Sequence, residues 1–233
     1  MAMTIELKKE MKALGDSERA KNALWFFKTG KGEYGEGDKF LGITVPLQRK
    51  VAKKYRDLPL VEVEKLLQSP IHEHRLTALF ILVDQFNKAD EAGKARIYKL
   101  YLKNTKYINN WDLVDSSAHF IVGGYLLDRP RDVLYKMARS RDLWKKRIAV
   151  LATFMFIRED DFKDALRISE ILLQDEHDLI HKAVGWMLRE VGNRDQATEE
   201  KFLKKHHKKM PRTMLRYAIE KFDEKKRQAY LEQ

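Results

Sequence analysis

An apolar helical segment recurs along the chain at nearly constant spacing, and this recurrence most constrains the fold. The segments begin at Arg75, Trp111, Arg147, Lys182 and Arg216, so successive starts lie 36, 36, 35 and 34 residues apart. A helix pair repeated at this period is typical of solenoids, in which the equivalent helices line one wall. The tetratricopeptide consensus is absent, so we predict an all-α, HEAT-like helical-repeat solenoid (an α-α superhelix). The alternative is a helical bundle whose spacing is coincidental.

Hydrophobic periodicity predicts helices through most of the chain and no β-sheet. The expected helices cover residues 4–14, 17–27, 46–55, 60–68, 71–87, 90–105, 110–126, 130–139, 142–158, 161–173, 177–191, 197–208, 211–221 and 223–231. Ser17 is the expected cap of the second helix. A glycine-rich loop occupies about residues 30–45. No Pro/Ser-rich linker interrupts the chain, so we expect a single domain over residues 1–233.

The charge balance points to an anionic partner. The chain has 46 Lys and Arg against 35 Asp and Glu, a net charge of +11, and nucleic acid is the commonest partner of such proteins. The chain has no cysteine, which excludes disulfides and thiolate metal sites. Its longest apolar stretch, Ile148 to Ile157, is too short to cross a bilayer. We therefore expect an intracellular, soluble protein that binds no membrane.

The strongest candidate site is the pair Trp111 and Asp115, which share one helix face at i, i+4 spacing. Asn109 or Asn110 can cap this helix. The helix dipole favours an ionised carboxylate near the N-terminus. Asp112 is the competing carboxylate, and it points to another face.

Two later repeats are expected to add an arginine and a second indole to the same wall. Arg147 lies 36 residues beyond Trp111, and Trp186 lies 39 residues further on. A carboxylate, a guanidinium and two indoles then converge. The alternative is that both tryptophans are core residues and that Asp115 pairs with Arg147 for structural reasons.

Other charged residues are expected at the surface. Arg75 is placed on the solvent-facing wall, where it can meet phosphate, whereas His72, His74, His206 and His207 are interpreted as solvated rather than metal-binding. A basic cluster near the C-terminus suits phosphate contacts, although an ordinary solvated helix is the alternative. It comprises Lys201, Lys204, Lys205, Lys208, Lys209, Arg212 and Arg216.

Several stretches resemble a known family. They are the loop from Lys28 to Pro46, Asn109-Asn-Trp-Asp-Leu-Val-Asp115, Trp144 to Val150, Lys182 to Glu190, and Pro211 to Ile219. In this order and spacing they resemble the bacterial and archaeal AlkD-type DNA alkylation repair proteins, over about residues 20 to 222.

The resemblance implies a DNA glycosylase that hydrolyses the N-glycosidic bond of cationic N3- or N7-alkylated purines in duplex DNA, the first step of base excision repair. The family's catalytic aspartate falls on Asp115, its active-site tryptophans on Trp111 and Trp186, and its groove arginine on Arg147. A further aromatic contact falls within Trp25 to Phe27. The expected DNA contacts are Arg147, Lys182, Lys204, Lys205, Lys208, Arg212 and Arg216.

The expected enzyme uses no metal or organic cofactor. We expect a monomer without an obligate protein partner, in the prokaryotic cytoplasm and associated with the nucleoid. Two other functions stay open at this point: a non-catalytic DNA-binding repeat protein, and a protein-interaction scaffold.

Overall fold

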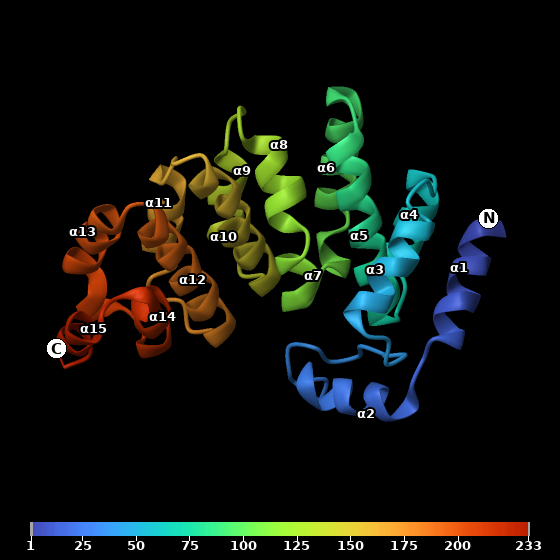
Figure 1. Cartoon of the computed structure of the whole chain (residues 1–233), viewed down its shortest axis with the longest axis horizontal. Coiled ribbons are helices and arrows are strands. Elements are labelled where there is room, and N and C mark those ends of the chain that lie inside the picture. Colours follow the sequence, from blue (N-terminus) through green and yellow to red (C-terminus); the bar gives the residue numbers. More distant parts are fainter. Residues whose placement is uncertain (1, 233) are drawn as a thin grey trace. The chain divides into compact units, whose positions relative to one another are not determined.

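The chain is built from helices in the computed structural model, which describes residues 2–232 (Figure 1). It divides into two compact units, the first ending at Ile121 and the second beginning at Val122. Within the described residues, the one β interaction outside helices is an isolated bridge between Lys39 and Ile71. The predicted absence of sheet is confirmed. The single domain expected over residues 1–233 stays a prediction.

The first unit is organised around helix α5, which packs against α3, α4, α6 and α7. Every side chain from His72 to Leu82 is buried, because α5 has neighbours on all of its faces. The helices of this unit are α1 (Ala2–Ala13), α2 (Ser17–Phe26), α3 (Val45–Lys54), α4 (Leu60–Leu67), α5 (His72–Lys88), α6 (Glu91–Lys103) and α7 (Trp111–Asp115).

The second unit stacks helices pairwise. Helix α12 packs against both α10 and α14. Helix α9 contacts α10, α11 contacts α10 and α12, and α13 contacts α12. The helices of this unit are α8 (Gly124–Leu126), α9 (Asp132–Ala138), α10 (Leu143–Arg158), α11 (Lys163–Ile171), α12 (Asp178–Arg194), α13 (Gln196–His206), α14 (Arg212–Ala218) and α15 (Glu224–Leu231).

The repeat pattern is confirmed inside each unit. The five recurring segments lie on α5, α7, α10, α12 and α14, and α5 contacts α7 just as α12 contacts α10 and α14. The chain is therefore a helical-repeat solenoid. Apart from the predicted helix over residues 110–126, the ends of the expected helices differ from the observed ones by at most three residues.

The predicted continuous helix over residues 110–126 is wrong. Helix α7 ends at Asp115, a π-helix follows over His119–Gly123, and α8 completes the segment. The reason lies at Ser117, whose hydroxyl donates to the Leu113 carbonyl and whose N–H donates to the Val114 carbonyl. Such local bonds compete with the regular i, i−4 pattern, and π-turns of this kind often mark functional sites.

The N-terminal cap of α2 also differs from the prediction. Asp16 accepts from the Arg19 N–H over 2.9 Å, so Asp16 caps this helix and Ser17 is its first residue. Within residues 2–232, no helix combines the length and the apolar character needed to cross a membrane.

Candidate functional site

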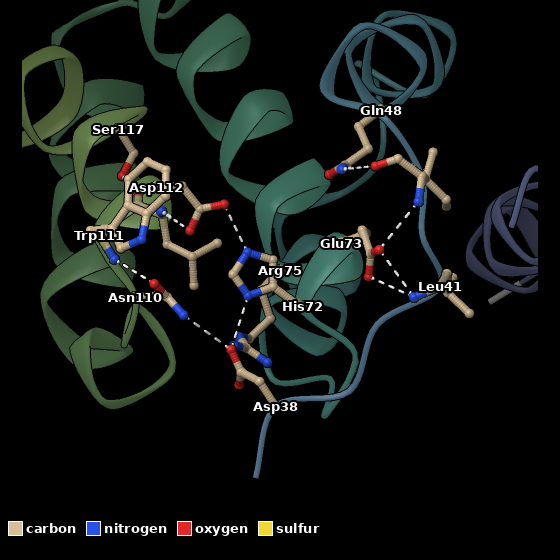
Figure 2. A network of polar contacts seen from close by, with 12 residues as sticks. Asp38, Leu41, Gln48, His72, Glu73, Arg75, Asn110, Trp111, Asp112 and Ser117 are labelled. Atoms are coloured by element: carbon tan, nitrogen blue, oxygen red, sulfur yellow. Dashed lines mark hydrogen bonds and ion pairs between the residues drawn. The ribbon is translucent and has the colours of Figure 1, made fainter. Parts of the chain in front are cut away.

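The start of α7 is held by a buried asparagine. Of the two candidate caps, Asn109 and Asn110, the structure uses Asn110. Its side-chain oxygen accepts a hydrogen bond from the Trp111 N–H over 2.8 Å. Asn110 is fully buried, and its Nδ2 donates to Asp38 Oδ2 over 3.4 Å. The glycine-rich loop, which carries Asp38, is thereby attached to the first residue of α7 (Figure 2).

His72 lies between two carboxylates at the start of α5. Its Nδ1 is 2.9 Å from Asp38 Oδ2, and its Nε2 is 2.8 Å from Asp112 Oδ2. Because both partners are carboxylates, both ring nitrogens donate and the ring is an imidazolium. The His72 side chain is only 2% exposed, and this burial lowers its pKa. The charge of Asp112 and the hydrogen bonds to both carboxylates act in the opposite direction and raise the pKa of His72 to about 9. A charged His72 therefore joins α5, α7 and the loop.

Arg75 supplies the second cation of this network. Its Nη2 donates to Asp38 Oδ1 over 2.7 Å, and both side chains are buried. Burial raises the pKa of Asp38, but the hydrogen bond from His72 and the charge of Arg75 hold it below its usual value. The network thus contains two cations, His72 and Arg75, and two carboxylates, Asp38 and Asp112. Their mutual attraction offsets the cost of removing these charges from water. The expectation that Arg75 faces solvent and phosphate is wrong, because Asp38 holds its guanidinium in the interior.

Glu73 fixes the loop from the opposite side. Its buried carboxylate accepts from the N–H groups of Leu41 and Gly42, over 3.0 and 2.8 Å. Gly42 has φ of +79°, and a Cβ there would lie 2.1 Å from the Asp16 carbonyl oxygen, so the loop approaches the start of α2 too closely for any side chain. The glycine-rich loop is thus pinned between α2 and α5.

The histidines of this helix were predicted to be solvated, and that prediction is wrong. His72 and His74 are buried; the Oγ of Ser69 lies 2.9 Å from His74 Nδ1, and burial lowers the pKa of His74 to about 4. His206 is buried as well. The available signal was the run His-Glu-His-Arg directly before the apolar run Leu76 to Val83, since ionisable residues at the start of a buried helix must be paired inside.

Aromatic rings surround the indole of Trp111. Phe27 stacks on Trp111 with ring centroids 5.5 Å apart, and Phe26 meets it edge-on at 5.8 Å. Phe27 also lies 4.7 Å from the His72 ring. Of the three residues from Trp25 to Phe27, Phe26 and Phe27 pack on Trp111, whereas Trp25 is 78% exposed; which of them makes the expected aromatic contact stays a prediction. A cavity of about 190 Å³ opens beside Phe27, His72 and Asp112.

Asp115 lies at the last position of α7, one turn after Trp111, and both residues are half-buried. Burial above all, with the charge of Asp115 adding to it, raises the pKa of the Tyr101 hydroxyl. Asp112 is engaged by His72, as described, and its Oδ1 accepts from the Leu113 N–H. Asp115 and Trp111 share one helix face, and a carboxylate beside an indole face is suited to hold a cation.

The other two candidate residues belong to the second unit. Arg147 on α10 is only 5% exposed, and its Nη1 donates to the Leu179 carbonyl over 2.5 Å. Trp186 on α12 is half-buried; its Nε1 donates to Glu190 Oε1 over 2.9 Å, and the Phe154 ring lies 6.2 Å away. The expected convergence of Arg147 and Trp186 with Trp111 and Asp115 stays a prediction.

The basic residues expected to contact phosphate are distributed over several elements. Lys182 lies on α12 and pairs with Asp178 at 2.7 Å, and Arg212 on α14 donates to the Leu231 carbonyl. Arg216 is exposed on the same helix. Three further residues lie elsewhere, namely Lys204 and Lys205 on α13 and Lys208 in the short helix over His207–Lys209.

The fold and the candidate site define a class: a helical-repeat protein that carries an indole and a carboxylate on one turn of a short, electrostatically anchored helix. Over residues 7–222 the sequence matches the family described as DNA alkylation repair enzyme. The chain belongs to this family, and the resemblance found in its motifs is confirmed.

A solved structure shares the fold. It is described as a predicted DNA alkylation repair enzyme from Enterococcus faecalis, and it superposes with a TM-score of 0.71 at 16% sequence identity. The match covers 90% of this chain and 97% of that one. No curated protein sequence matches this chain.

Proposed function

We propose that this protein is a DNA glycosylase that removes cationic N3- or N7-alkylated purines from duplex DNA. The observation that carries the proposal is the pair Trp111 and Asp115 on one turn of α7, in a chain that belongs to the DNA alkylation repair family. An aromatic face and a carboxylate side by side suit a reaction in which positive charge develops on a sugar next to a cationic base.

The chemistry requires little acid catalysis. An N3- or N7-alkylated purine already carries a positive charge, so it departs as a neutral base when the C1′–N bond breaks and the electron pair stays on nitrogen. The positive charge passes to the sugar as an oxocarbenium ion. A single carboxylate therefore suffices, in contrast to the carboxyl pair of most glycoside hydrolases.

Asp115 is the residue to which we assign this role. Its carboxylate stabilises the oxocarbenium ion and orients the water that forms the new C1′–O bond. The proton lost by that water passes to Asp115 and then to solvent. Asp112 is unsuited to the same task, because its Oδ2 is engaged by the buried His72 imidazolium.

The two tryptophans are assigned to the lesion and its sugar. Trp111 is backed by Phe26 and Phe27, and Trp186 is fixed by its hydrogen bond to Glu190. Rings held in this way present a rigid face to a cation. Both indoles are half-buried and so keep part of their surface in contact with solvent.

Duplex DNA is the proposed partner, and basic residues of the second unit are proposed to contact its phosphates. Lys182 and Arg216 are the best placed of the predicted residues, because they lie on α12 and α14, the helices equivalent to α7 in the repeat. A phosphate contact by Arg147 requires atoms other than the Nη1 that bonds the Leu179 carbonyl.

The test is incubation of the purified protein with duplex DNA methylated at purine N3 and N7. We expect free methylpurine and an equal amount of alkali-labile abasic sites. DNA binding without base release would support the non-catalytic DNA-binding protein instead. Absence of both would support the protein-interaction scaffold.

A further inference from the structure

A groove lies between α11 and α13 in the second unit, and none of the residues assigned above to base release lines it. It encloses about 640 Å³. Its lining comes from two helix faces: Lys163, Leu166, Arg167 and Glu170 on α11, and Thr198, Lys201, Phe202, Lys205 and His206 on α13.

The rim of the groove is strongly basic. Lys163 and Arg167 lie one turn apart on α11, as Lys201 and Lys205 do on α13, and all four are exposed. Glu170 is the one carboxylate of the lining, and Lys205 engages it at 3.0 Å. Within residues 2–232, Lys163 and Lys201 form no ion pair, so both positive charges are available to a ligand.

The floor of the groove is apolar. Phe202 is 8% exposed at its base, and the half-buried Leu166 lies across from it on α11. A ligand side chain that covered these two residues would gain by removing apolar surface from water.

Positive charge continues past the groove towards α9. A neighbouring depression of about 470 Å³ shares Lys163 and Arg167 with the groove, and it adds three arginines and two aspartates, namely Arg129, Arg131, Arg139, Asp132 and Asp164. An extended peptide can therefore meet basic residues both in the groove between α11 and α13 and in the depression beside α9.

We propose that this groove binds an extended acidic peptide segment of a partner protein. A large apolar side chain of the peptide sits on Leu166 and Phe202, and carboxylates on either side of it pair with Lys163 and Lys201. The proposal is independent of the glycosylase function, since it uses none of the residues assigned to base release.

Two features of the groove favour a peptide over a nucleic acid backbone. A sugar-phosphate chain has no apolar side chain for the floor formed by Leu166 and Phe202. Glu170 is paired with Lys205 through Oε1, and its Oε2 can accept a hydrogen bond from the backbone N–H of an extended peptide, a donor that a sugar-phosphate chain lacks. Lys205, expected from the sequence to contact DNA, is assigned here to the rim of this groove.

The probe is a fluorescein-labelled octapeptide of Asp and Glu around one central Phe, titrated with the full-length protein and followed by anisotropy. We expect binding that the double variant Lys163→Glu/Lys201→Glu weakens by about 10-fold or more, the loss of two ion pairs of moderate strength. The matched control is Lys225→Glu on the exposed face of α15, with less than about 2-fold change. A peptide with Ser in place of Phe should also bind about 10-fold more weakly.

Three results would overturn the proposal. They are no binding of the octapeptide to the wild-type protein, equal binding of the Phe and Ser peptides, and a duplex oligonucleotide whose binding the double variant weakens as much as that of the peptide. Circular dichroism establishes that each variant is folded. Base release from methylated DNA by the single variant Lys163→Glu should match the wild type, which separates this proposal from the function assigned above.

Discussion

Each unit buries an ionisable side chain beside a helix that carries a candidate tryptophan, but by opposite means. In the first unit His72 lies between Asp38 and Asp112 and joins α5 to α7, the helix of Trp111. In the second unit Glu199 of α13 is 1% exposed, and its Oε2 packs over Gly192 of α12, the helix of Trp186. Within residues 2–232, Glu199 Oε1 has no hydrogen-bond partner.

His72 and Glu199 both stay protonated in the interior, but for different reasons. His72 keeps its proton because two carboxylates raise its pKa to about 9, and the resulting charge is compensated. Glu199 keeps its proton because burial raises its pKa to about 8, with Glu200 adding to the shift and Arg189 opposing it. The charged His72 joins α5, α7 and the glycine-rich loop, whereas at Glu199 the fold only accommodates a buried polar group.

The lengths of the two helices explain why α7 is held by buried charges and α12 is not. Helix α7 has 5 residues, too few to be stable without outside contacts. Helix α12 has 17 residues and buries seven of them, mostly apolar. The placement of Trp111 and Asp115 therefore depends on electrostatics, and that of Trp186 depends on packing.

The largest effect is expected from His72→Leu. This change leaves Asp38 and Asp112 without their shared cation, and breaking a buried ion pair costs about 3–5 kcal/mol. Denaturant unfolding should show this loss, together with slower base release because α7 loses its anchor. The matched variant His207→Leu, in the turn after α13, should cost less than about 1 kcal/mol. Equal losses for the two variants would mean that the network does not anchor α7.

The next effect is a pH dependence that belongs to His72. Its pKa is about 9 in the folded protein against 6.5 as the ordinary value, so its contribution is complete below pH 6.5 and is lost as the pH rises to about 9. We expect a decline of about 3 kcal/mol in the free energy of unfolding across this window. The variant His72→Gln should remove this part of the decline; an unchanged profile would show that His72 is not charged.

Glu199→Gln should act in the opposite direction. Ionised Glu199 destabilises the fold, so stability falls between pH 4.5, the ordinary pKa, and about 8. Glutamine needs no proton, although its amide is still buried, and we expect a gain of about 1–2 kcal/mol at pH 7.5. Thermal unfolding measures it, with Glu224→Gln on α15 as the exposed control. A loss of stability would show that Glu199 has a partner as an anion.

The smallest expected effect concerns DNA binding and distinguishes the exposed Arg216 from the buried Arg147. Arg216→Ala should lower the slope of log affinity against log salt by about 0.9, the value for one phosphate contact, at unchanged stability. Lys225→Ala is the control. If Arg216→Ala leaves the slope unchanged while Arg147→Ala lowers it, the phosphate contact belongs to Arg147 despite its burial.

The sequence predicted the helices and their period well, because an apolar stripe at helical spacing follows directly from packing. It also predicted the helical start at Trp111 and its asparagine cap. It did not predict that His72, Arg75 and Asp38 meet, because a contact between a loop and a helix more than 30 residues away leaves no local pattern. The π-turn after Ser117 was missed for a related reason: the hydroxyl bond to Leu113 competes with helix geometry without altering the apolar periodicity.

The central claim is that Asp115 carries base release, and the most direct test is the single-turnover rate of 7-methylguanine release by Asp115→Asn. We predict a rate about 10²–10³-fold below wild type, the typical loss of one electrostatic stabiliser, with duplex binding retained. The matched variant Asp128→Asn, at an exposed position after α8, should release base at the wild-type rate. An Asp115→Asn protein that released 7-methylguanine as fast as the wild type would contradict the account.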